Sequence, residues 1–118
     1  MQYELPLLCV LNGAKPVPSE VVESWQSLHD AINWSFAKRG DEVVKTVDWM
    51  ARHLGMKRQH VSRMLNKRDL KLDSIQGHIW DCLTGWKAYE QFTKLEKRRI
   101  AERATEQLTK AIQARMAA

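Results

Sequence analysis

Basic side chains are concentrated in one short stretch of this 118-residue chain. Residues 57–71 hold a single acidic residue, Asp69, and carry a net charge of +5, which equals the net charge of the whole chain. The neighbouring segments 41–56 and 72–92 are slightly acidic. Lysine and arginine neutralise phosphates, so this concentration predicts a surface directed at phosphate groups. The six basic residues are Lys57, Arg58, Arg63, Lys67, Arg68 and Lys71.

Side chains that can recognise base edges lie among these basic residues. A helix over residues 57–66 would bury Val61, Met64 and Leu65 and turn a polar face outward. That outward face holds Arg58, Gln59, Ser62 and Arg63, with His60 at its edge. Arginine can bond guanine O6 and N7, and glutamine can pair with adenine N6 and N7. The side chains expected beside the sugar–phosphate backbone are Lys57, Lys67, Arg68 and Lys71. The alternative is a basic face that contacts only solvent.

The sequence contains no pattern typical of an enzyme active site. A Gly-rich phosphate loop, a nucleophile elbow and an HExxH motif are all absent. His78 and Cys82 are four residues apart, but two ligands do not make a zinc site and no second pair lies nearby. We therefore expect no catalysis, no metal ion and no cofactor.

The elements that must position the polar face are predicted to be helices. The apolar residues from Val21 to Phe36 recur every three or four positions, which predicts one helix over residues 20–38. Thr46 is expected to cap a second helix that ends at Gly55, and a third follows over residues 57–66. Asp73 or Ser74 is expected to cap a fourth helix that ends at Gly85. The residues expected to face inward from this fourth helix are Ile75, Ile79 and Leu83.

The second and third predicted helices have the residues that a helix-turn-helix requires. Ala51 is small where the two helices meet, and Gly55 accepts a left-handed turn. Val61 and Met64 follow at the spacing that packs the third predicted helix on the second. This pattern resembles the helix-turn-helix of the lambda-repressor-like (Cro/CI-type) family, and the likeness covers about residues 19–85.

The resemblance implies an all-α, five-helix DNA-binding fold whose last helix is a long C-terminal helix. It further implies a sequence-specific regulator of transcription of phage or prophage type that binds operator DNA as a dimer. The recognition helix, about residues 57–66, would lie in the major groove, and Gln59 and Ser62 match the family's base-contacting positions. RNA polymerase or another regulator is a candidate partner.

Two residues depart from the family pattern. Lys57 stands where the family usually places a Ser, Thr or Asp cap, and a lysine there is unfavourable unless a phosphate docks at the helix end. Gly77 lies inside the fourth predicted helix, where glycine costs about 1 kcal/mol relative to alanine. We expect close packing of a Trp or Phe side chain against Gly77.

The chain divides into an extended N-terminal arm (1–18), the DNA-binding domain (19–85) and a C-terminal helix (86–118). The apolar line of this last helix contains Leu95, Ala101, Ala104, Leu108, Ala111 and Ile112. The helix could pair with a second chain, fold back on the domain or bring basic residues to an anionic partner. We favour pairing, because such domains usually read two half-sites about one helical turn apart.

Composition excludes other classes of protein. The longest apolar run, Leu5–Leu11, is interrupted by Pro6 and is too short to span a membrane. Cys9 and Cys82 are far apart, as expected for two reduced thiols in a cytoplasmic protein. The family resemblance implies that this is the cytoplasm or nucleoid of a bacterial host. Three alternative functions remain: DNA binding in replication or partition, RNA binding, and a helical protein-interaction module that has lost DNA binding.

Overall fold

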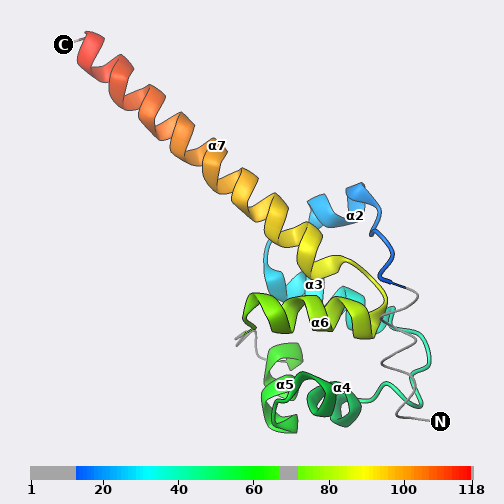
Figure 1. Ribbon diagram of the computed structural model, residues 1–118. Helices are drawn as coiled ribbons and strands as arrows, with labels where there is room; N and C mark the ends of the chain where they lie inside the picture. Colours follow the sequence, from blue (N-terminus) through cyan, green and yellow to red (C-terminus); the bar gives the residue numbers. More distant parts are fainter. Residues whose placement is uncertain (1–12, 67–71, 118) are drawn as a thin grey trace.

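Six helices form the part of the chain described by the computed structural model, residues 13–66 and 72–117 (Figure 1). They are α2 (Ser19–Ser24), α3 (Leu28–Ala37), α4 (Val47–Leu54), α5 (Arg58–Asn66), α6 (Ser74–Thr84) and α7 (Ala88–Ala117). No strand occurs among these residues. The prediction of an all-α fold with a long C-terminal helix is therefore confirmed.

The prediction of a single helix over residues 20–38 was wrong. The chain leaves the helical conformation at Trp25, which is extended with φ −77° and ψ 133°. The Asp30 carboxylate accepts hydrogen bonds from the backbone N–H groups of Gln26 (2.9 Å) and Ser27 (3.3 Å). These bonds satisfy amides at a new helix start, so α2 and α3 are separate helices and the described chain has six helices rather than five.

One hydrophobic core joins α3, α4, α5 and α6. Its fully buried side chains include Ile32, Met50 and Trp80, and the Trp80 indole N–H donates to the Ser35 hydroxyl at 2.9 Å. Ile75, expected to face inward, is instead 72% exposed. Trp80 buries more apolar area than Ile75 would, and α6 turns its Trp80 side inward. Ile75 lies five residues before Trp80, about 140° around the helix, which carries it out of the core.

A second core joins α2, α3 and the first half of α7. It contains Val22, Trp25, Phe92 and Leu95, with the Trp25 and Phe92 rings 6.4 Å apart. Residues 13–18 of the expected N-terminal arm run along the start of α7. There the Gln91 side-chain amide exchanges two hydrogen bonds with the Val17 backbone, at 2.7 and 2.9 Å. Residues 1–12 lie outside the described residues.

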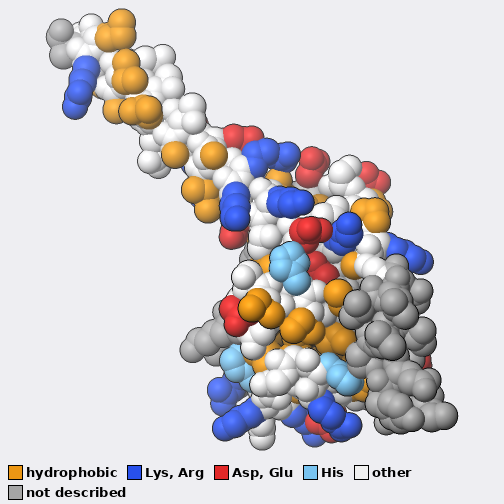
Figure 2. All heavy atoms as spheres, in the orientation of Figure 1, with side chains coloured by type: hydrophobic (Ala, Val, Ile, Leu, Met, Phe, Trp, Pro, Cys, Tyr) orange, Lys and Arg blue, Asp and Glu red, His pale blue; other side chains and the backbone are white. Residues whose placement is uncertain are grey.

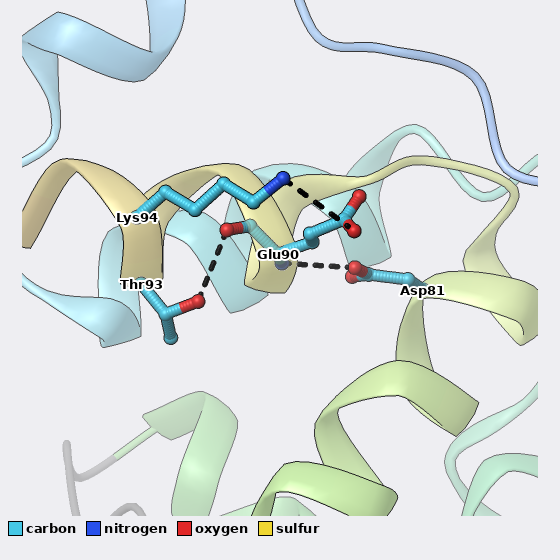
Figure 3. A network of polar contacts seen from close by, with 4 residues as sticks. All are labelled: Asp81, Glu90, Thr93 and Lys94. Carbon is cyan, nitrogen blue, oxygen red and sulfur yellow. Dashed lines mark hydrogen bonds and ion pairs between the residues drawn. The ribbon is translucent and has the colours of Figure 1, made fainter.

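The junction of α6 and α7 is held by a buried carboxylate. Asp81 of α6 accepts hydrogen bonds from the backbone N–H groups of Tyr89 (2.8 Å) and Glu90 (3.0 Å), in the first turn of α7. Figure 3 shows the bond from Glu90. Glu90 also pairs with Lys94 at 3.8 Å. Burial raises the pKa of Asp81 to about 6, against the opposing effect of the two amide hydrogen bonds.

The raised pKa of Asp81 predicts a pH dependence of stability. Because this pKa is higher in the folded than in the unfolded chain, the contribution of Asp81 is complete below about pH 4 and is lost as pH rises through about 6. The difference in unfolding free energy between the parent and Asp81→Asn (parent minus variant) should be about 1 kcal/mol larger at about pH 5 than at about pH 7.5. Urea denaturation of both proteins measures this difference. An unchanged or falling difference would contradict the assignment.

The second half of α7 projects from the body of the molecule (Figure 1). Every residue from Ile100 to Ala117 is exposed, and the molecule extends 70 Å along its longest axis but 28 and 21 Å along the others. Among the helices of residues 13–66 and 72–117, none combines the length and apolar character needed to cross a membrane.

Candidate nucleic-acid interface

Helices α4 and α5 form a helix–turn–helix unit, residues 47–66. Thr46 caps α4, as predicted, by accepting a hydrogen bond from the Trp49 backbone N–H at 3.2 Å. Gly55 ends α4 in the left-handed conformation with φ 69°. The backbone N–H of the next residue, Met56, donates a hydrogen bond to the Ala51 carbonyl oxygen at 2.9 Å. The local sequence thus closes the first helix and begins the second within three residues.

The inner side of α5 is fixed to the domain by apolar burial. Val61 and Met64 are fully buried in the core that α5 shares with α3, α4 and α6. A hydrogen bond adds to this packing, because Nδ1 of His29 on α3 donates to the Met64 carbonyl oxygen at 2.9 Å. Asn33 Nδ2, one turn later on α3, lies 2.8 Å from the other ring nitrogen of His29. His29 therefore positions the C-terminal end of α5.

His29 is a residue whose loss should loosen α5 selectively. In His29→Ala the Met64 carbonyl loses its donor from α3, and we expect a cost of about 1 kcal/mol in unfolding free energy. Amide hydrogen exchange should become faster in α5 than in α3 or α6. His78→Ala, which removes an exposed histidine from α6, should leave exchange in α5 unchanged. Equal exchange rates in α5 of His29→Ala and the parent would show that this hydrogen bond does not position the helix.

The outer side of α5 carries the predicted polar face. Arg58, Gln59 and Arg63 are exposed and Ser62 is half-buried. Together with Asn66 they line a shallow, open depression of about 360 Å³. Asn66 was not among the predicted residues, although it lies one turn after Ser62 and its Nδ2 donates to the Ser62 hydroxyl at 3.3 Å. Figure 2 shows Lys and Arg side chains gathered at the end of the molecule formed by α4 and α5.

The remaining residues predicted to contact DNA differ in their exposure to solvent, and three of them lie outside the described residues. Lys57 is exposed just before α5, and its carbonyl oxygen accepts from the His60 backbone N–H at 3.0 Å. His60 is half-buried, and its Nε2 atom is buried without a partner among the described residues, so this atom does not face solvent. Lys67, Arg68 and Lys71 lie outside the described residues.

The helix–turn–helix unit and its cap carry a positive charge. Residues 46–66 contain four basic side chains and one acidic one, Asp48. The Asp48 carboxylate lies 3.6 Å from Arg58 Nε, so the start of α4 holds the first arginine of α5. Burial, and secondarily the charge of Arg52, lowers the pKa of His53 and so favours its neutral form. The permanent positive charges of this surface are those of its arginine and lysine side chains.

Within residues 13–66 and 72–117, no three His, Cys, Asp or Glu side chains are grouped so that they could hold a metal ion. Comparison with known proteins matched no family model, no curated protein and no solved structure.

Proposed function

We propose that this chain binds double-stranded DNA sequence-specifically, with α5 in the major groove. The observation that carries the proposal is the outer face of α5. Arg58, Gln59, Ser62 and Arg63 share that face with Asn66, while the opposite face is buried. These are side-chain types that hydrogen-bond base edges, and the major groove of B-form DNA admits an α-helix.

The contacts that fix α5 to the rest of the domain support this proposal. Recognition of bases requires side chains on a rigid element, because a misplaced donor loses its partner. The buried Val61 and Met64, the Gly55 turn and the His29 hydrogen bond supply that rigidity. Lys57 lies exposed at the start of α5, where a lysine side chain can contact a phosphate of the DNA backbone.

We extend the proposal to a transcriptional regulator of phage or prophage type, acting in the bacterial cytoplasm or nucleoid. This extension rests on the resemblance of residues 19–85 to the lambda-repressor-like family. The proposed activity requires no cofactor and no chemical step.

The test is a comparison of nucleic acids under two salt conditions. Fluorescence anisotropy would follow the full chain on labelled duplex DNA, single-stranded DNA and an RNA hairpin at about 50 and 150 mM salt. We expect the duplex to bind most tightly, with an affinity that falls steeply as salt rises. Tighter binding to the single strand or to RNA, or no binding to any of the three, would overturn the proposal.

A further inference from the structure

The two halves of α7 present apolar side chains on opposite sides of the helix. In the first half, Ala88, Phe92 and Leu95 are buried against α2 and α3. Leu95 and Ile100 are five residues apart, which corresponds to a rotation of about 140° around the helix. The apolar line of the second half therefore begins on the side of α7 that faces away from its own domain.

This second apolar line is continuous and uncovered. Ile100, Leu108 and Ile112 are 53%, 62% and 49% exposed, and the small residues between them are exposed as well. We call these residues the stalk face: Ile100, Ala101, Ala104, Leu108, Ala111 and Ile112. Figure 2 shows hydrophobic side chains along the projecting helix. Because α7 is one unbroken helix, the stalk face cannot turn back onto its own domain.

Between Ile100 and Ile112, the charged side chains of the projecting helix lie away from the stalk face. Glu102 pairs with Arg98 at 3.8 Å, and Glu106 pairs with Lys110 at 3.4 Å, both within the same helix. No charged residue interrupts the stalk face between Ile100 and Ile112. A complementary surface must therefore be apolar and uncharged, and the stalk face of a second copy has this character. Its alanines allow two helix axes to approach to about 8 Å.

We propose that the stalk faces of two copies of this chain pack together, with their α7 helices parallel. The pairing itself is inferred from α7 alone, whereas the parallel orientation rests on the proposed DNA binding. Helix α7 leaves the domain on the side away from α4 and α5 (Figure 1). Parallel pairing places both α5 helices at the same end of the dimer, as one duplex requires, and antiparallel pairing would place them at opposite ends.

The pairing is tested by sedimentation equilibrium of the full chain without DNA. We expect a dimer at micromolar concentration. Leu108→Glu places a charge in the stalk face and should raise the dimer dissociation constant about tenfold or more. Gln113→Glu adds the same charge outside the stalk face and should leave the constant unchanged. Circular dichroism checks that both variants stay helical. A monomeric parent, or a dimer indifferent to Leu108→Glu, would overturn the pairing.

The orientation is tested by oxidising Ala104→Cys and locating the disulfide by mass spectrometry, with the parent as control for Cys9 and Cys82. Parallel helices place the two copies of residue 104 opposite each other, so a 104–104 disulfide is expected. Antiparallel helices centred on Leu108 place Ala104 opposite Ile112 instead. A dimer that forms no 104–104 disulfide would overturn the parallel arrangement. Since neither experiment contains DNA, a failure of DNA binding cannot be mistaken for a failure of pairing.

Discussion

Replacement of Arg63 by alanine is expected to weaken binding to the chain's preferred duplex by about 1–3 kcal/mol and to relax the preference at one base position. Arg63 is exposed on the outer face of α5 and forms no ion pair with the described residues, so its guanidinium is available to a base. Removal of an exposed side chain should change the free energy of unfolding by no more than about 0.5 kcal/mol. A titration of labelled duplex measures the loss.

The matched control for Arg63→Ala is Lys110→Ala. It removes the same unit of charge from an exposed position in the projecting half of α7, away from α5 (Figure 1). We expect this variant to bind the preferred duplex nearly as tightly as the parent and with unchanged base preference. Equal losses in the two variants would mean that the total charge, rather than the α5 face, determines binding. Parent-like binding by Arg63→Ala would show that α5 does not read bases.

Gly77→Ala is expected to destabilise the fold by about 1–3 kcal/mol through overpacking. Helix propensity alone predicts the opposite sign, because alanine is favoured over glycine within a helix by about 1 kcal/mol. The difference arises because a Cβ atom at Gly77 would overlap the Tyr89 ring. Tyr89 lies in the first turn of α7 and is itself buried. Its displacement would disturb the junction that Asp81 holds.

A double-mutant cycle separates overpacking from other causes. In a Tyr89→Ala background the ring is gone, and Gly77→Ala should become neutral or stabilising. Urea denaturation of the four proteins gives the coupling between the two sites. If Gly77→Ala destabilised both backgrounds equally, the contact between Gly77 and Tyr89 would not be the reason for a glycine in α6.

Local sequence predicted most, but not all, of the helix boundaries that depend on nearby groups. Thr46, Gly55 and Asp73 act as caps in the structure as expected, because a cap is a contact within a few residues. The break at Trp25 also has a local signal, the Ser27–Asp30 spacing of a capping box. The regular apolar line from Val21 to Phe36 concealed it, since that line continues across both helices.

Contacts between distant residues could not be predicted from the sequence. His29 reaches the Met64 carbonyl across 35 residues, and a half-exposed histidine on a helix gives no indication of such a partner. The glycine at position 77 correctly predicted the approach of an aromatic ring, but the ring is Tyr89 rather than Trp or Phe. The apolar line of α7 from Ala101 to Ile112 could likewise be found in the sequence. Leu95 was wrongly included in that line, because it is buried with Phe92 in the second core on the opposite side of the helix.

Selection of bound sequences from a random duplex pool tests the central claim most directly, namely that the outer face of α5 reads bases. The selection should run at about 150 mM salt, where non-specific phosphate binding is suppressed. We predict enrichment of one motif, present as two inverted half-sites because two chains bind together. A pool that stays random, with only weak and salt-sensitive binding, would contradict the claim and leave the basic surface without a sequence-reading role.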